Sequence, residues 1–223
     1  MGCFFETQGG VMIRADRVEK LKSNQPIKIT TPAANEVTNK IGFEILKRYA
    51  KKEKFELSRE KVTFVETDFW HINNMEQDGS FDGAWLCFYN FEGIEAEFKG
   101  FESLFIDQNL SPYPNFSALE FMTTDAVIKE KSESLCKFLE VTNEMAKYLQ
   151  GNIEDGKKMF YQYSGEEKSA LMDKIIEDTI LRLKTDIKAD EKKWLELYKF
   201  LEELELVKLT DKQYNTIWEI KGH

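Results

Sequence analysis

The feature that most restricts the fold is a fully apolar run of strand length at residues 84–89, Ala-Trp-Leu-Cys-Phe-Tyr. A strand with one face in solvent alternates apolar with polar residues, whereas this run is apolar on both faces. A buried strand, as found in parallel sheets with helices on both faces, has this pattern. We therefore expect the run to form a buried strand of an α/β sheet.

Shorter strand and helix patterns alternate around this run. Asn35 is a good N-cap for the first helix, whose apolar residues recur at helical spacing as far as Tyr49. The alternation predicts a wound α/β sheet, in which ligands lie at the carboxyl ends of the strands. The expected strands are 10–14, 27–31, 62–66, 84–89 and 103–106, and the expected helical segments are 36–49, 68–75 and 93–98.

Beyond a last expected strand at residues 118–122 the chain is predicted to be helical. Thr124 or Asp125 can cap a long helix, and two further amphipathic helices follow. Their apolar stripes are expected to face the core. The stripe residues are Val127, Ile128, Leu135, Phe138, Leu139, Met145 and Leu149; Leu171, Ile175, Ile176, Ile180 and Leu183; and Trp194, Leu197, Tyr198, Leu201 and Leu204.

Composition and charge exclude several classes of protein. The formal net charge is −9, and each half of the chain is acidic, so neither a nucleic-acid groove nor an anionic-membrane face is expected. Three scattered cysteines and two histidines predict no disulfide framework, no metal site and no metal cofactor. No apolar run spans a bilayer, and the first residues lack the pattern of an export signal.

The sequence contains none of the common catalytic or nucleotide-binding motifs, so we expect no enzyme, no catalytic residue and no cofactor. His71 follows Trp70 with no cysteine or serine nearby as a nucleophile. We interpret it as a surface or packed residue rather than a catalyst.

Two segments at predicted strand ends are candidates for a small-molecule site. Residues 30–36 join a strand end, a loop of small residues and a helix start, where hydroxyls and backbone N–H groups can face a polar or anionic ligand. An ordinary turn with an asparagine cap explains the same residues. Residues 88–93 combine aromatic rings with Asn90 and Glu92, which can stack a flat ring and hydrogen-bond its edge. Core packing at a strand-helix corner is the alternative.

Residues 82–100, Asp-Gly-Ala-Trp-Leu-Cys-Phe-Tyr-Asn-Phe-Glu-Gly-Ile-Glu-Ala-Glu-Phe-Lys-Gly, resemble the strand-helix motif of proteins that bind thiamine-pyrimidine precursors. These are solute receptors of ABC importers, in a broader group that includes nitrate and sulfonate binders. The segment from Pro112-Tyr113-Pro114 to Thr124 resembles the family's crossover, and residues 194–206 and 211–214 resemble its closing helix and tail. The resemblance covers essentially the whole chain and is most specific at residues 82–100.

The resemblance implies a type II periplasmic-binding fold, in which one wound α/β lobe is joined by an incomplete second lobe and carboxyl-terminal helices. It also implies a small heteroaromatic or anionic nutrient bound in an interlobe cleft, an ABC permease as partner, and an extracytoplasmic location. The implied domains are residues 1–24, a remnant of lobe one; 25–112, the α/β lobe two; and 113–223, the crossover strand and helical part of lobe one. The ligand-binding residues that we expect are Thr31, Ala34, Asn35, Glu36, Tyr89, Asn90, Phe91, Glu92 and Tyr113.

The chain departs from the family pattern in three places. The family's opening portion has no counterpart, its glycine-rich loop is replaced by residues 30–34, and Phe91 stands where relatives often have tryptophan. One alternative is therefore a truncated, non-binding remnant that forms a homodimer through apolar surface near Val11 and Leu119. A pyrimidine-synthesising enzyme of the same fold is a further alternative, although the iron-binding cysteine motif of such enzymes is absent.

Overall fold

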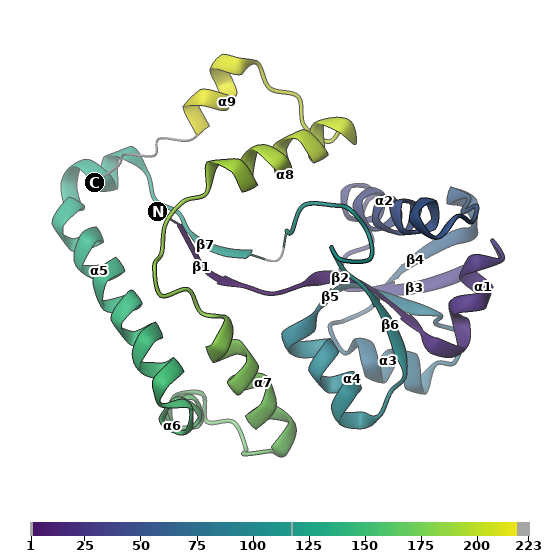
Figure 1. The fold of residues 1–223 in the computed structure, drawn as a ribbon, viewed down its shortest axis with the longest axis horizontal. Helices are drawn as coiled ribbons and strands as arrows, with labels where there is room; N and C mark the ends of the chain where they lie inside the picture. Colours follow the sequence, from purple (N-terminus) through teal and green to yellow (C-terminus); the bar gives the residue numbers. More distant parts are fainter. Residues whose placement is uncertain (1, 117, 218–223) are drawn as a thin grey trace. The chain divides into compact units, whose positions relative to one another are not determined.

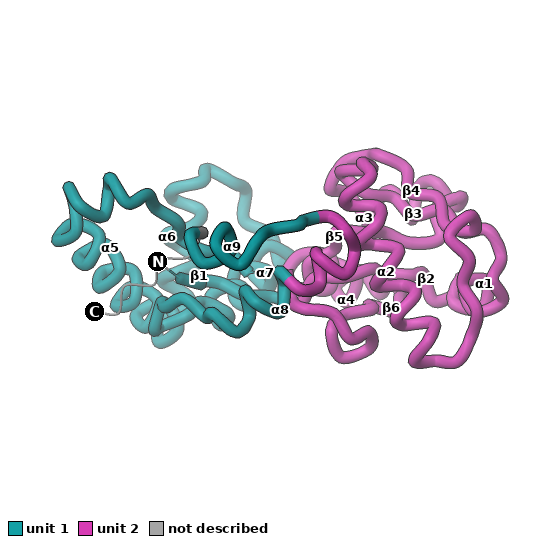
Figure 2. The backbone as a smooth tube through the Cα atoms, turned by 90° about the horizontal axis from the view of Figure 1, so that it is seen from above, with its two compact units in different colours: residues 1–7, 117–198, 207–223 teal, residues 8–116, 199–206 magenta. Residues whose placement is uncertain are grey.

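The computed structural model describes residues 2–116 and 118–217, which form two compact units (Figure 2). Unit 2 comprises residues 8–116 and 199–206, and unit 1 comprises the remaining described residues. The three-part division at residues 24/25 and 112/113 stays a prediction of domain organisation. The compact units have other limits, because the strand at Gly9–Arg14 belongs to unit 2.

Unit 2 is built on a five-stranded sheet in the order β4-β3-β5-β2-β6. Strand β3 runs parallel to β4 and β5, whereas β2 runs antiparallel to both β5 and β6. The apolar run is therefore a buried inner strand, as predicted, but only one of its two neighbours is parallel to it. The strands are β2 (Gly9–Arg14), β3 (Ile27–Thr31), β4 (Val62–Glu66), β5 (Gly83–Phe88) and β6 (Ser103–Ile106).

Helices cover both faces of this sheet (Figure 1). Helix α2 lies on one face, and α3 and α4 lie on the other. Asn35 caps α2 as predicted, because its side chain accepts a hydrogen bond from the Thr38 amide at 3.0 Å. The helical elements are η1 (Ala15–Arg17), α1 (Val18–Lys22), α2 (Glu36–Glu53), η2 (Arg59–Lys61), α3 (His71–Gln77), η3 (Tyr89–Gly93) and α4 (Ile94–Lys99).

The two faces of β5 bury different groups. On the side of α3 and α4, Ala84 and Cys87 join an apolar cluster with Met12, Ile72 and Met75. On the side of α2, the Trp85 indole N–H donates to the Thr38 carbonyl at 3.0 Å, so the polar atom of this buried ring is satisfied. Both faces of the run are thus buried, which explains why it contains no polar residue.

Unit 1 consists of a two-stranded antiparallel sheet and packed helices. The strands are joined by a stack of Phe4 on Phe121, with ring centroids 4.3 Å apart, and the Phe138 ring meets Phe121 edge to face. Strand β1, helix α6 and the break between α5 and α6 were not expected from the sequence. The elements are β1 (Gly2–Glu6), β7 (Ala118–Phe121), α5 (Asp125–Gly151), α6 (Ile153–Ser164), α7 (Ala170–Arg182), α8 (Glu191–Glu203), whose last residues belong to unit 2, and α9 (Asp211–Ile217).

Two expectations about apolar surface are wrong. Phe138 and Met145 of the expected α5 stripe are 45% and 44% exposed rather than buried, although the Phe138 ring still contacts Phe121; the buried residue of this helix is Ala146. Val11 is fully buried between β5 and β6, so it offers no surface for self-association, whereas Leu119 on β7 is exposed. Burial between strands of one sheet cannot be recognised from a short apolar segment alone.

Gly10 offers a test of the packing of β2. A Cβ at this position would collide with the main-chain carbonyl oxygen of Ile106, which cannot move without breaking the sheet. We expect Gly10→Ala to lower the free energy of unfolding by about 3 kcal/mol in urea titrations, since overpacking against backbone has no easy relief. The matched control is Gly79→Ala, because nothing lies within 4 Å of its added methyl group. Equal stability of the two variants would contradict the register of β2 and β6.

Candidate site at the carboxyl edge of the sheet

The carboxyl ends of three neighbouring parallel strands meet at one edge of the unit 2 sheet. These ends are Thr31 on β3, Glu66 on β4 and Phe88 on β5. We call this region the carboxyl edge and define it as residues 31–36, 66–71 and 88–93. In open α/β sheets ligands bind outside the carboxyl ends of the strands, so this edge is the candidate site. It contains every expected ligand-binding residue except Tyr113.

The loop between β3 and α2 has most of its donors already engaged. Thr31 is buried, and the Asn35 side chain caps α2. The Ala34 amide donates to the Glu66 carboxylate at 3.1 Å. Glu36 and Asn35 are exposed in the first turn of α2. A carboxylate of the chain itself therefore occupies the amide that could otherwise hold an anionic ligand.

The segment after β4 presents two aromatic rings to solvent. Phe69 and Trp70 are 64% and 65% exposed. Asp68 fixes the turn beneath them, because its carboxylate accepts from the Trp70 amide and the Asn74 side chain, each at 2.9 Å. These hydrogen bonds, with that of Asn74 first, hold the pKa of Asp68 below its usual value. The loop is thus tied down by polar contacts while its rings remain accessible.

Sequence reasoning missed these two rings because the short helix was expected to begin at Asp68. The helix begins at His71, which leaves Phe69 and Trp70 in the loop. Adjacent large aromatic residues directly after a predicted strand end were the available signal.

Strand β5 reaches the edge through a β-bulge. Gly10 of β2 pairs with Cys87 and Val11 pairs with Trp85, so Leu86 is the extra residue. Its φ of 63° lies in the left-handed region, which is uncommon for a bulky side chain. The strand then passes directly into a single π-helical turn, Tyr89–Gly93. Bulges and π-helical turns concentrate at functional sites, and here both lie within residues 86–93.

Tyr89 and Phe91 face different surroundings. The Tyr89 hydroxyl hydrogen-bonds to the Glu97 carboxylate on α4, and its ring packs edge to face on Phe105. Gly93 lies against the same ring, because an added Cβ would collide with it. Phe91, by contrast, is 48% exposed. The structure therefore holds Tyr89 against α4, and Phe91 is the accessible ring of this turn.

The turn also buries two polar side chains, Asn90 and Glu92. One Glu92 carboxylate oxygen accepts a hydrogen bond from the Phe88 amide at 2.7 Å. Burial disfavours the ionised carboxylate and raises the pKa of Glu92 to about 7. The hydrogen bond from the Phe88 amide lowers this pKa but offsets only part of the effect of burial. Glu92 is therefore a carboxyl group that titrates near neutral pH.

Tyr113 lies outside the carboxyl edge. Its buried hydroxyl donates to the Gly9 carbonyl at 2.6 Å and lies 3.2 Å from the Ile106 carbonyl. Its ring stacks on Phe116. These contacts tie the segment after β6 to the sheet, so the structure gives the Tyr113 hydroxyl a role in the fold of unit 2.

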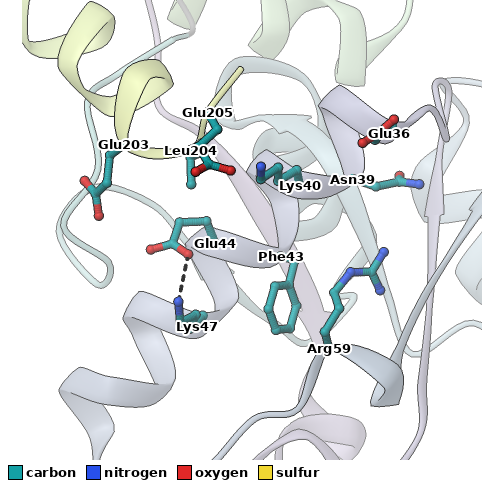
Figure 3. A pocket seen from close by; sticks show the side chains of 10 residues that line it. All are labelled: Glu36, Asn39, Lys40, Phe43, Glu44, Lys47, Arg59, Glu203, Leu204 and Glu205. Carbon is teal, nitrogen blue, oxygen red and sulfur yellow. Dashed lines mark hydrogen bonds and ion pairs between the residues drawn. The ribbon is translucent and has the colours of Figure 1, made fainter. Parts of the chain in front are cut away.

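A cavity of about 580 Å³ in unit 2 lies mostly away from the carboxyl edge (Figure 3). It runs along α2 past Lys40 and Phe43, between Arg59 on one side and Glu203–Glu205 on the other. Of the expected ligand-binding residues it contains only Glu36. Its acidic and basic groups are mixed, so its charge favours no single class of ligand.

Among the described residues, no group of three or more histidine, cysteine or acidic side chains is arranged to hold a metal ion. None of the described helices has the length and apolar character needed to cross a membrane.

Glu92 makes the stability of the fold depend on pH. Its pKa is about 7 in the folded protein against 4.5 as the ordinary value, so the folded state binds the extra proton. The contribution of Glu92 to the free energy of unfolding therefore falls as the pH rises through this interval. We expect Glu92→Gln to gain about 3 kcal/mol relative to the wild type between about pH 5 and about pH 8 in urea titrations. A difference that does not change with pH would show that Glu92 is not buried.

The family and the fold follow from comparison with known proteins. The family model described as NMT1/THI5 like matches residues 10–154. No curated protein matches the chain by sequence. Among solved structures, the periplasmic aliphatic sulphonate binding protein SsuA from Escherichia coli has a TM-score of 0.63 at 10% identity, covering 99% of this chain and 71% of its own. The alkanesulfonate-binding protein SsuA from Xanthomonas axonopodis pv. citri, bound to MOPS, has a TM-score of 0.58 at 10% identity, with coverage of 93% and 70%.

These likenesses agree with the type II periplasmic-binding fold expected from residues 82–100, with its wound α/β unit and carboxyl-terminal helices. The family match includes the whole carboxyl edge and more than half of the chain. The chain therefore belongs to the NMT1/THI5-like family.

Proposed function

We propose that the chain is the solute-binding component of an ABC importer and that the carboxyl edge of unit 2 binds a small heteroaromatic solute, neutral or positively charged. The observation that carries the proposal is the set of groups at this edge. It combines the exposed rings of Phe69, Trp70 and Phe91 with carboxylates, and its three segments contain neither lysine nor arginine.

The charge of the edge separates two solute classes that the sequence left open. Glu36, Glu66 and Asp68 belong to the three segments, as does Glu92, which is ionised only in part near neutral pH. A sulfonate or nitrate ion would meet these groups with no cation from the same segments to balance its charge, and like charges at close range repel. The Ala34 amide, a possible anion donor, is already bonded to Glu66. The edge therefore favours an amino-substituted ring over the sulfonates that the two SsuA proteins are named for.

In this proposal the aromatic rings stabilise the bound solute in addition to the carboxylates. Flat heteroaromatic rings stack on aromatic side chains, and each such contact contributes about 0.5–1.5 kcal/mol beyond the area it buries. Carboxylates next to the stack can accept hydrogen bonds from ring amino groups. An aminopyrimidine of the thiamine-precursor type offers both a flat face and such donors.

The importer role rests on the family and the fold. Both solved neighbours are named as binding proteins, which supports binding rather than catalysis for this chain. On this proposal the protein works outside the cytoplasm and passes its solute to an ABC permease.

A binding panel tests the solute class. We expect thiamine or its aminopyrimidine precursors to raise the melting temperature, whereas nitrate and alkanesulfonates do not. A ligand present at about a hundred times its dissociation constant adds about 2.7 kcal/mol to the free energy of unfolding. A response to sulfonates alone would contradict the charge argument, and no response to any member would contradict the proposed function.

Single substitutions of the exposed rings test the stacking contacts. Trp70→Ala and Phe91→Ala are each expected to weaken binding of the best panel ligand about tenfold in titration calorimetry, the equivalent of about 1.4 kcal/mol. The melting temperature should stay close to that of the wild type, because Trp70 is 65% and Phe91 48% exposed. Tyr163→Ala is the matched control, since this ring is 97% exposed on α6 of unit 1. Loss of affinity in the control as well would count against a site at the carboxyl edge.

Self-association remains a prediction of the sequence. Of the two apolar residues that the sequence suggested for it, Leu119 is exposed and Val11 is buried. Sedimentation of the purified chain at several concentrations distinguishes a monomer from a dimer.

A further inference from the structure

His71 is a polar side chain that is buried in the fold without a hydrogen bond to its ring. It is fully buried, at 0% exposure, and neither of its ring nitrogens has a hydrogen-bond partner among the described residues. Buried polar groups in folded proteins are nearly always hydrogen-bonded, and each exception calls for an explanation. A phenylalanine of similar shape would fill the same space without this cost.

The imidazole is neutral at physiological pH. Burial lowers the pKa of His71 to about 4, against the smaller opposing effects of the Asp68 charge and the Leu86 backbone. The Asp68 carboxylate itself is bonded to Trp70 and Asn74, and the Leu86 backbone does not reach hydrogen-bond geometry with the ring. A neutral imidazole has one N–H donor and one acceptor nitrogen, and both are unused here.

The position of His71 connects it to the carboxyl edge. It is the first residue of α3, directly after the two exposed rings of Phe69 and Trp70. The Phe69 ring lies edge to face on the imidazole, with centroids 6.4 Å apart. On the sheet side the neighbouring backbone is that of Leu86, the bulged residue in the left-handed region. An unused polar ring and a strained backbone therefore coincide beneath the loop that presents the aromatic rings.

We propose that His71 determines solute specificity by hydrogen bonding to the bound solute, which enters beside Trp70 after the Phe69 ring has moved from the imidazole. This inference rests on the proposed function, because it assigns His71 to the same site. The solute supplies the hydrogen-bonding group that the imidazole lacks in the solute-free fold. Because the imidazole is neutral, it selects for hydrogen-bonding groups and not for charge.

This contact narrows the class of solute. The carboxylates of the edge can accept hydrogen bonds but cannot donate them when ionised. A neutral imidazole can donate to an unprotonated ring nitrogen, a group that no ionised carboxylate of the edge can recognise. A solute that carries an amino group beside a ring nitrogen, as aminopyrimidines do, satisfies a carboxylate and His71 together.

Stability and affinity are expected to change in opposite directions when His71 is replaced. His71→Phe should raise the melting temperature of the solute-free protein by a few degrees, because an unsatisfied polar group is removed from the interior. The same variant should bind the best ligand of the aminopyrimidine panel at least about tenfold more weakly in titration calorimetry. His71→Gln, which keeps a donor and an acceptor, should retain more affinity than His71→Phe.

The outcomes separate the two proposals. Equal affinity of the wild type and His71→Phe would overturn the role of His71 and leave the proposed function standing. Failure of the wild type to bind any panel member would overturn both.

Nuclear magnetic resonance of the wild type provides a test that does not depend on a variant folding. The chain has two histidines, so the ring signals of His71 are readily assigned. Adding the ligand should shift the His71 ring ¹⁵N signals in the direction expected for new hydrogen bonding, while those of His223 stay in place. Ring signals of His71 that do not respond to a ligand bound to the wild type would overturn the inference.

Discussion

The antiparallel insertion of β2 between β5 and β6 is the constraint on which unit 2 depends. It requires glycine at position 10, where the backbone of Ile106 approaches too closely for any side chain. It also requires β5 to pair with a parallel strand, β3, on one side and with an antiparallel strand, β2, on the other. The Leu86 bulge lies within the antiparallel pair, and the π-helical turn and the buried Glu92 follow it along the chain. The candidate site is thus shaped by the pairing of a strand that contributes no residue to it.

The carboxyl edge differs in kind from a site built for anions. An anion site offers free amides and cations, whereas here the chain places its own Glu66 carboxylate on the Ala34 amide. The two SsuA structures share the fold at 10% identity, and such likeness leaves the chemistry of the site open. Solute class in a fold of this kind is decided by a few side chains at the strand ends, while the sheet beneath them is kept.

Much of the α/β unit could be predicted from the sequence, and the reasons are local. The Asn35 cap, the alternation in β3 and the apolar run of β5 are each encoded within a few neighbouring residues. The antiparallel direction of β2 could not be predicted, because it depends on pairing with residues far along the chain. The same limit applied to the site. The sequence singled out the turn after β5 as a candidate and named Tyr89 together with Phe91, since the contact of Tyr89 with Glu97 and Phe105 is visible only in three dimensions. His71 was interpreted as a surface or packed residue; the structure buries it, but no sequence pattern distinguishes the two or reveals a missing hydrogen bond.

The bulge at Leu86 has a consequence for how such sites can diverge. Successive residues of a strand point to opposite faces, so one extra residue reverses the face of every residue after it. Cys87 enters the core directly after the unpaired Leu86, and the π-helical turn that begins at Tyr89 continues from this register. Deleting or inserting one residue at this point would reverse the faces of Cys87 and Phe88 and reorient the turn that follows, without changing a single side chain. Length variation at the bulge is therefore a route by which the lining of the site can be replaced in one mutational step.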